Sequence, residues 1–282
     1  MGYDGLIYSI ISSVFIIGLT FYYWIVPSLN SKLLFYPTKV HLDDFHNLHN
    51  QYGRNIKRVK FDTHDKTMLT GLLVNTERKP KWTDNIFLYS HGNGAWLGPL
   101  IQHTSIKMLS KYGSVFLYDY RGYGASDGEP SEMGLYDDIL SAWNFLLKEK
   151  NIQPSKIIIF GHSLGSSVSS HLVSTLVKQN KELPKAVILE APFSTLADIA
   201  SHVYPPLSSL VVYNFNNLHN IKSMNKSLPI YVLHSKTDET IPYDHALKIK
   251  NETGCNMIEI SGKHCEPIYN SHVDKLLVSL IK

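Results

Sequence analysis

Short apolar runs alternate with amphipathic stretches along most of this chain, and this alternation restricts the possible folds more than any other feature of the sequence. Long helical stretches, such as Ser131–Lys148 and Leu164–Lys178, separate several of the runs. The apolar runs are Ile56–Phe61, Met68–Val74, Ile86–Ser90, Val115–Asp119, Lys156–Phe160, Ala186–Glu190, Pro229–His234 and Asn256–Ile260. We predict that each is a strand and that the first two pair antiparallel. Near-continuous apolar strands joined by helices are typical of a parallel sheet covered on both faces. The sequence therefore predicts an α/β fold with a mostly parallel sheet, in which functional residues follow the strand ends.

A different kind of segment precedes this alternation. Residues Gly5–Val26 form an uncharged run of 22 residues, which as a helix would extend about 33 Å and exceed the ~30 Å hydrocarbon core of a bilayer. The aromatic residues 22–24 lie where an interfacial belt would fall. We therefore predict one N-terminal transmembrane helix, with residues 1–32 as a membrane anchor and residues 33–282 as a single catalytic domain.

Two other interpretations of the N-terminal run stay open. A cleaved signal peptide usually has a basic start and a small-residue cleavage site, whereas Asp4 precedes this run and Pro27–Leu29 is a poor cleavage site. A core helix would have a polar face, but Ser, Thr and Tyr are the most polar residues in this segment. Lys32 and Lys39 follow the run and no basic residue precedes it, which favours a cytoplasmic catalytic domain of a single-pass protein.

Composition excludes several classes of function. The net charge is +3 without a basic block, so the chain has no sign of nucleic-acid binding. Cys255 and Cys265 are too few for a disulfide framework, and their spacing fits no zinc motif. The histidines are mostly scattered singly. We expect neither a metal nor a cofactor, and the sequence does not indicate an oligomeric state.

A G-x-S-x-G motif follows the predicted strand Lys156–Phe160 and is centred on Ser163. In this motif the chain turns so sharply from strand to helix that small residues are needed on both sides of the serine, here Gly161 and Gly165. The motif alone is common by chance, but its position between a buried strand and a helix is specific. Ser163 is therefore the predicted nucleophile, in preference to an incidental serine in a tight turn.

A nucleophilic serine needs a base, and the base needs an acid that orients it. The expected chain order is Ser, then Asp or Glu, then His. His264 follows the last predicted strand and is the predicted base, and Asp238 follows the strand Pro229–His234 and is the predicted acid. Glu190 is the alternative acid. His234 is interpreted as a structural strand-end histidine. The histidines at 171 and 272 lie on predicted helices and are expected to point away from the serine.

The oxyanion of an acyl-transfer intermediate needs two preorganised N–H donors. We predict that the Leu164 N–H supplies one, because it follows the nucleophile directly. The loop His91-Gly-Asn-Gly94 should supply the other, from Asn93 in preference to Gly94, because its glycines let the backbone approach a substrate. His91 is interpreted as a structural residue that holds this loop.

Five stretches together resemble the α/β-hydrolase-fold serine hydrolases: HGNG, residues 118–128, GHSLGS, SKTDETIP and GKH. The chain is most similar to their single-pass membrane branch, the abhydrolase-domain proteins related to the yeast bud-emergence protein, and the similarity covers about residues 33–282. The resemblance implies ester or thioester hydrolysis, and some relatives remove palmitate from proteins. It also implies that Arg121 is structural, the alternative being a contact with an anionic substrate.

The substrate is less well defined than the reaction. Apolar residues between Tyr204 and Phe215 could line an acyl-chain pocket or pack on the core, and both interpretations stay open. With the predicted anchor, they suggest small-molecule, lipid-like or acylated substrates at a membrane. The alternatives are an inactive scaffold with the same fold and, if the N-terminal run is cleaved, a soluble secreted esterase.

Overall fold

A computed structural model describes residues 31–32, 34–40, 56–75, 85–203, 205, 208, 211–224 and 228–282. The predicted membrane span Gly5–Val26 lies outside these residues, and so does part of the apolar stretch that begins at Tyr204. Within the residues described, no helix is both long enough and apolar enough to cross a bilayer.

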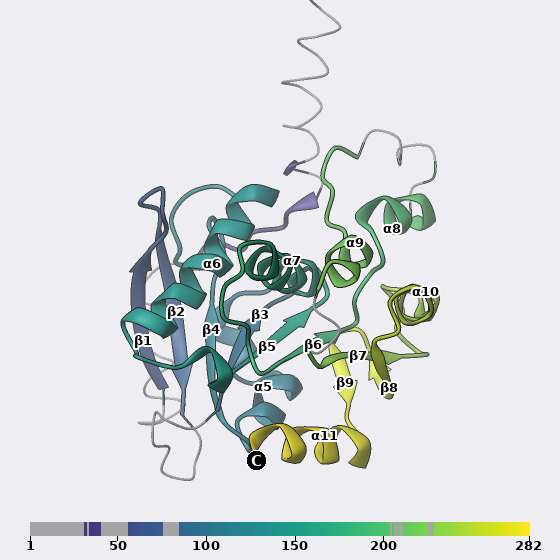
Figure 1. Cartoon of the computed structure of the whole chain (residues 1–282). Helices are drawn as coiled ribbons and strands as arrows, with labels where there is room; N and C mark the ends of the chain where they lie inside the picture. Colours follow the sequence, from purple (N-terminus) through teal and green to yellow (C-terminus); the bar gives the residue numbers. More distant parts are fainter. Residues whose placement is uncertain are drawn as a thin grey trace, which may run out of the picture.

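One sheet organises the described part of the chain, with its nine strands in the order β1-β2-β4-β3-β5-β6-β7-β8-β9 (Figure 1). Neighbouring strands from β4 to β8 run parallel, whereas β1, β2 and β9 pair antiparallel at the two edges. The strands are β1 (Ile56–Asp62), β2 (Met68–Val74), β3 (Ile86–Ser90), β4 (Ser114–Tyr118), β5 (Ile157–His162), β6 (Ala186–Glu190), β7 (Ile230–Ser235), β8 (Asn256–Lys263) and β9 (Glu266–Ile268). The mostly parallel sheet and its antiparallel opening pair confirm the predicted fold class.

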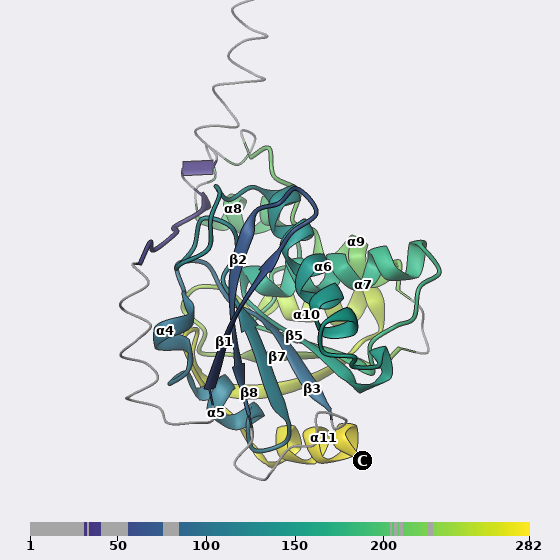
Figure 2. The ribbon, with the colours of Figure 1, turned by 90° about the vertical axis from the view of Figure 1, so that its left-hand side faces the viewer.

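Helices cover both faces of this sheet, as the two views in Figures 1 and 2 show. One face carries α6 (Glu132–Lys148), α7 (Leu164–Lys178), α9 (Asn217–Lys222) and α10 (Tyr243–Thr253). The opposite face carries α4 (Leu97–Leu100), α5 (Thr104–Leu109) and α11 (Ser271–Ile281). Helix α8 (Leu196–Val203) follows β6.

The apolar strands are explained by these two helical layers. Successive side chains of a strand point to opposite faces, and in β3 Leu88 packs in the core on the α6 and α7 side while Phe87 and Tyr89 pack on the α11 side. β5 behaves in the same way, with Ile159 on one face and Phe160 on the other. Both faces of the central strands are therefore buried, which explains why these strands are apolar along their whole length.

Helix α6 shows how local sequence limits an element. Ser131 caps its N-terminus, because the Ser131 hydroxyl accepts a hydrogen bond from the Gly134 N–H at 3.1 Å. Glu132 lies in the first turn and Lys148 in the last, where each charge opposes the helix dipole. The predicted stretch Ser131–Lys148 therefore corresponds to the cap and the whole helix.

The structure differs from the sequence-based expectation after the last predicted strand. β8 continues to Lys263, beyond the predicted end at Ile260, and turns back into a short strand β9 that was not predicted. His264 thus lies in the tight turn of a β-hairpin instead of a free loop. A three-residue strand at the edge of a sheet has no hydrophobic periodicity of its own, which is why the pattern did not reveal it.

Candidate active site

Ser163 lies at the sharp turn between β5 and α7, and its backbone is strained. Its φ is 53° and its ψ −118°, a region that residues with a side chain seldom adopt and that costs of the order of 1–3 kcal/mol. Two glycines make the turn possible. A Cβ on Gly161 would lie 2.3 Å from the Gly165 carbonyl oxygen, and a Cβ on Gly165 would lie 2.1 Å from the Ser90 carbonyl oxygen. The turn projects the serine side chain beyond the carboxyl end of β5.

His264 reaches the serine from the turn between β8 and β9. Its Nε2 is 3.0 Å from the Ser163 Oγ, and its Nδ1 is 2.8 Å from the Asp238 Oδ2. The side chains of both His264 and Asp238 are largely buried. The structure therefore brings together the three residues that the sequence analysis selected, although they are separated by up to 101 positions.

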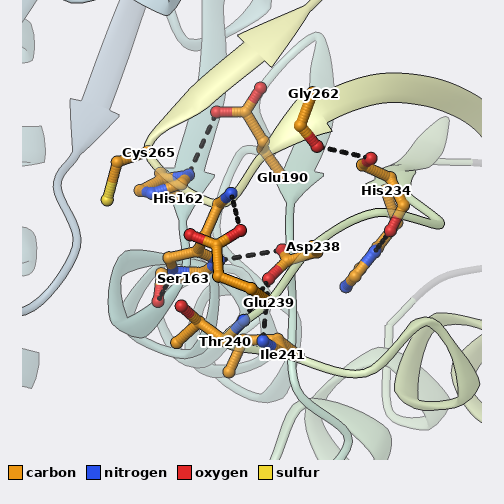
Figure 3. A network of polar contacts seen from close by, with 12 residues as sticks. His162, Ser163, Glu190, His234, Asp238, Glu239, Thr240, Ile241, Gly262 and Cys265 are labelled. Atoms are coloured by element: carbon orange, nitrogen blue, oxygen red, sulfur yellow. Dashed lines mark hydrogen bonds and ion pairs between the residues drawn. The ribbon is translucent and has the colours of Figure 1, made fainter.

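Asp238 is held by backbone donors as well as by the histidine (Figure 3). Its Oδ1 accepts hydrogen bonds from the N–H groups of Thr240 at 2.9 Å and Ile241 at 2.8 Å. Burial raises the pKa of Asp238, but the hydrogen bond and charge of His264 and the two N–H donors outweigh it, so the pKa lies below its ordinary value. An ionised Asp238 accepts only, so the His264 Nδ1 carries the proton and its Nε2 is an acceptor toward the serine hydroxyl.

A neighbouring carboxylate that the sequence analysis did not select also touches this histidine. The Glu239 Oε2 accepts a hydrogen bond from the His264 backbone N–H at 3.1 Å. Glu239 therefore ties the hairpin turn to the loop that carries Asp238 (Figure 3). Its position directly after Asp238 was visible in the sequence, but no motif distinguishes it from a solvated loop residue.

Glu190, the alternative acid, bonds to a different histidine. Its carboxylate lies 3.1 Å from the His162 Nδ1 and accepts hydrogen bonds from the hydroxyls of Ser105, at 3.0 Å, and Tyr269. Burial raises the pKa of Glu190, but the hydrogen bond and charge of His162 and the bond from Tyr269 lower it further than burial raises it. Glu190 thus orients His162, whose ring centroid is 5.0 Å from that of His264.

The loop that follows β3 lies directly against the serine. A Cβ on Gly92 would be 3.0 Å from the His162 Cδ2 and 3.3 Å from the Ser163 Cβ, closer than an ordinary van der Waals contact, so glycine permits this approach without a shift of its neighbours. The backbone N–H groups of Asn93 and of Leu164, the first residue of α7, make no hydrogen bond to another described residue. One predicted oxyanion donor therefore follows Ser163 directly in the chain, and the other lies on the loop after β3 that packs against the serine.

The side chain of Asn93 connects this loop to the N-terminal segment of the domain. Its Oδ1 accepts hydrogen bonds from the Tyr36 N–H at 3.1 Å and the Tyr123 hydroxyl at 2.7 Å, and its Nδ2 donates to the Leu34 carbonyl. Phe35, which lies between Leu34 and Tyr36 in the chain, is buried. Residues 34–36, at the start of the predicted catalytic domain, are therefore packed into the domain beside the candidate site.

Phe35 also explains part of the apolar segment after α8. Its ring makes edge contacts with Tyr213 at 5.4 Å and Phe215 at 6.2 Å between centroids. Phe215 is fully buried, and Val211 packs against the same core. The described residues of this stretch therefore favour the core-packing interpretation over an acyl-chain pocket.

His91 and Asp119 form a buried pair below the loop. The His91 Nδ1 donates to the Gly92 carbonyl at 2.8 Å, and its Nε2 is 3.7 Å from the Asp119 Oδ1, which accepts from the Leu97 N–H. Burial lowers the pKa of His91 to about 4 and raises that of Asp119 to about 8. Both side chains are thus uncharged near neutral pH, and their contacts agree with a structural role for His91.

Arg121 is surrounded by carboxylates. Its guanidinium donates to Asp138 at 2.8 Å, to Asp65 at 2.8 Å and to Asp137 at 3.2 Å. These contacts occupy its nitrogens with groups of the protein itself and favour the structural interpretation over contact with an anionic substrate.

In the described ranges, no group of three or more metal-binding side chains is arranged to hold a metal ion.

The chain is similar to known hydrolases in sequence and in structure. Residues 83–237 match the model of the Hydrolase_4 family, described as serine aminopeptidase, S33. The chain is 31% identical over 223 residues to the human alpha/beta hydrolase domain-containing protein 17B, covering 74% of this chain and 72% of the relative. It is 28% identical to protein bem46 of Schizosaccharomyces pombe, over 68% of this chain and 64% of the relative. An alpha-beta hydrolase from Vibrio vulnificus has a similar structure, with a TM-score of 0.72 at 23% identity, covering 91% of this chain and 94% of that one.

Proposed function

Because the chain belongs to the Hydrolase_4 family of α/β-hydrolases, we propose that it is a serine hydrolase that cleaves esters or thioesters through an acyl-enzyme on Ser163. The observation that carries this proposal is the continuous hydrogen-bonded line from the Ser163 Oγ through His264 to Asp238, with distances of 3.0 Å and 2.8 Å. Nucleophilic catalysis by a serine requires a base within hydrogen-bond reach of the hydroxyl and a carboxylate that orients this base. Ser163, His264 and Asp238 have this arrangement.

In the first half of the reaction, the Ser163 Oγ attacks the carbonyl carbon of the substrate while the His264 Nε2 takes the hydroxyl proton. The negative charge that develops on the carbonyl oxygen is stabilised by the N–H groups of Leu164 and Asn93. The bond from the carbonyl carbon to the leaving oxygen or sulfur then breaks, and His264 gives its proton to that atom. The products of this half are the free alcohol or thiol and the acyl-serine.

The second half repeats these steps with water as the nucleophile. His264 takes a proton from the water as its oxygen attacks the acyl carbon, and returns that proton to the Ser163 Oγ as the ester bond to the serine breaks. Asp238 remains ionised and stabilises the imidazolium in both halves, in keeping with its lowered pKa. The net reaction consumes one water and releases a carboxylic acid.

We also propose that the protein acts at a membrane. The support is the uncharged run Gly5–Val26, which is long enough for a single transmembrane helix. Lys32 and Lys39 after this run support a cytoplasmic catalytic domain. The substrates would then be lipid-like or acylated molecules that reach the domain at the membrane surface.

The full-length protein and its Ser163→Ala variant test the proposed reaction. The wild type should react with a fluorophosphonate probe and hydrolyse p-nitrophenyl esters and acyl thioesters. The variant should lose the labelling and several orders of magnitude in kcat, with an unchanged thermal unfolding transition. An aminoacyl arylamide in the same assay separates esterase from aminopeptidase activity.

Two results would contradict the proposal. Labelling of the Ser163→Ala variant at full stoichiometry would mean that another serine is the nucleophile. A folded wild-type protein that is neither labelled nor active would instead favour the inactive scaffold. Intact-mass analysis of the mature N-terminus distinguishes an anchored protein from a secreted esterase whose N-terminal run is removed.

A further inference from the structure

The β8–β9 hairpin, which carries His264 in its turn, receives little support from the sheet itself. β9 has three residues and is the edge strand beside β8 (Figure 1). Its central residue, Pro267, has no N–H to donate to the strand pairing. Pro267 is buried, but Glu266 and Ile268 on either side of it are exposed. Strand pairing and apolar packing of β9 therefore contribute little to the position of the turn, and polar contacts must hold it.

One set of polar contacts comes from the end of β7 and the loop that carries Asp238. The Ser235 hydroxyl donates to the Gly262 carbonyl at 2.6 Å, and the Glu239 carboxylate accepts from the His264 N–H at 3.1 Å. Asp238 itself bonds to the His264 ring. These contacts join the hairpin to the acid, but none of them joins it to the element that carries the nucleophile.

A second set of contacts begins at His103, just before α5. The His103 Nε2 is 2.8 Å from the carbonyl oxygen of Cys265, the residue after His264. The His103 Nδ1 accepts a hydrogen bond from the Ser105 N–H at 3.3 Å and so caps α5. Burial lowers the pKa of His103 below its ordinary value, so the ring is neutral near pH 7. With Nδ1 as the acceptor, the ring proton is on Nε2, which therefore donates to the Cys265 carbonyl.

Tyr269 holds the other end of the hairpin, because it follows β9 directly. Its hydroxyl donates to the Glu190 carboxylate and is 2.7 Å from the Ser105 hydroxyl oxygen. Burial and the charge of Glu190 raise the pKa of Tyr269 well above its ordinary value, so the hydroxyl keeps its proton. The pKa of Glu190 lies below its ordinary value, so the acceptor is ionised. A hydrogen bond to an ionised acceptor is stronger than one between neutral groups.

Glu190 links this second set of contacts to the nucleophile. Its carbonyl oxygen accepts the Ser163 N–H at 2.9 Å, while its carboxylate accepts from Tyr269 and from the Ser105 hydroxyl. The His103 Nδ1 is also 3.0 Å from the Ser105 Oγ. His103 and Tyr269 therefore belong to one buried network, which joins the β8–β9 hairpin to the residue that is bonded to the backbone of Ser163.

We propose that His103 and Tyr269 are positioning residues that set the distance between the His264 Nε2 and the Ser163 Oγ, an inference that rests on the proposed serine hydrolase function. Proton transfer between these atoms needs a separation of about 2.6–3.2 Å, and the observed 3.0 Å leaves little room for a displacement of the hairpin. Loss of either contact frees the hairpin from Glu190 and hence from Ser163. Both residues act through His264 and not on the reacting atoms.

Tyr269→Phe in the full-length protein removes the hydroxyl and keeps the ring. We expect kcat for p-nitrophenyl acetate to fall by about 10-fold to 10²-fold, the scale of a misplacement of about 1 Å, with little change in KM. The rate of fluorophosphonate labelling should fall in proportion, because the attack of Ser163 uses the same proton transfer. Tyr112→Phe is the matched control, since the Tyr112 hydroxyl donates to the Asp274 carboxylate at 2.7 Å and has no contact with the hairpin network. It should keep the wild-type kcat and labelling rate.

Two variants of His103 separate positioning from the capping of α5. His103→Asn keeps a side chain that caps helices well, but it is too short to reach the Cys265 carbonyl. His103→Gln is a poorer cap, but it can place an amide N–H where the His103 Nε2 lies. We therefore expect kcat and the labelling rate to be lower in His103→Asn than in His103→Gln, although thermal unfolding should show His103→Asn to be at least as stable. If Tyr269→Phe does not fold, the order of these two variants decides.

Two outcomes would overturn the positioning role while leaving the hydrolase function intact. In the first, a folded Tyr269→Phe variant has the kcat and labelling rate of the active wild type. In the second, His103→Asn is as active as His103→Gln or more active, which would mean that His103 acts only as a helix cap. Absence of turnover and of Ser163 labelling in the wild type would instead overturn the proposed function itself.

Discussion

The side-chain amide of Asn93 binds the backbone of Tyr36, with the Asn93 Oδ1 accepting the Tyr36 N–H at 3.1 Å. The same side chain donates to the Leu34 carbonyl. Asn93 is also the residue whose N–H is the proposed oxyanion donor. The segment that follows the predicted membrane anchor is therefore hydrogen-bonded to the loop that carries the proposed oxyanion donor.

Truncations on either side of this contact should have different effects. Deletion of residues 1–28 should release the protein from carbonate-washed membranes and keep hydrolysis of a short soluble ester. Deletion of residues 1–40 should also remove the buried Phe35 and two of the three partners of the Asn93 side chain, Leu34 and Tyr36, so we expect lower thermal stability and at least ten-fold lower activity. If the shorter deletion stays on the membrane, a second membrane contact exists; if the two deletions are equally active, the segment does not support the loop.

Asn93→Ala should lower kcat more than it changes KM. The variant keeps the backbone N–H but removes the bonds that orient it, and loss of an oxyanion donor costs about 10²–10³ in kcat, so we expect an effect of up to about 10². Tyr123→Phe removes only one of the bonds to the Asn93 Oδ1 and should cost less. Steady-state kinetics and affinity for a boronic-acid inhibitor measure both. A rise in KM with an unchanged kcat would mean that Asn93 acts in substrate binding alone.

Asp238→Asn should reduce activity by roughly 10⁴-fold with the fold intact, because an amide no longer fixes the His264 tautomer. Glu190→Gln should cost much less in kcat, since Glu190 bonds to His162, Ser105 and Tyr269. Its main effect should be lower stability from a weakened buried network. Activity and thermal unfolding of both variants test this. A larger kcat loss for Glu190→Gln would assign the orienting role to Glu190.

Asp119→Asn should change how stability depends on pH. Burial raises the pKa of Asp119 to about 8, so between about pH 4 and pH 8 the folded state binds a proton that the unfolded state does not. The stability that this proton provides is complete below the unfolded pKa and is lost as the pH rises through about 8. Between pH 6 and pH 9 the variant should therefore gain roughly 3 kcal/mol in free energy of unfolding relative to the wild type.

Urea denaturation at the two pH values measures this difference. The comparison uses Asp244→Asn as its control, because Asp244 is exposed at the start of α10. A difference between Asp119→Asn and the wild type that does not change with pH would show that Asp119 is ionised in the folded protein.

The elements and the three central site residues could be predicted from the sequence because their signals are local. A strand buried on both faces must be apolar along its length, and a strand-to-helix turn as tight as that at Ser163 admits only small neighbours. In a parallel sheet the strand ends meet at one edge. Residues after β5, β7 and β8 could thus be expected to meet, and the distances among Ser163, Asp238 and His264 agree with that expectation.

Contacts between distant side chains were decided only by the tertiary structure. Leu34 and Tyr36 are nearly 60 positions from Asn93, and no spacing rule relates them, because an amide side chain can bond to any backbone that packing brings near. The same holds for Glu190 and His162, and for the hairpin that carries His264. The division into an anchor and a domain at residue 33 stays a prediction. The residues that end the strands can be identified from the sequence alone, because burial imposes a periodic pattern of apolar residues. The partners that those residues meet depend on how the layers pack, because the pattern specifies a face of the sheet and not a neighbour.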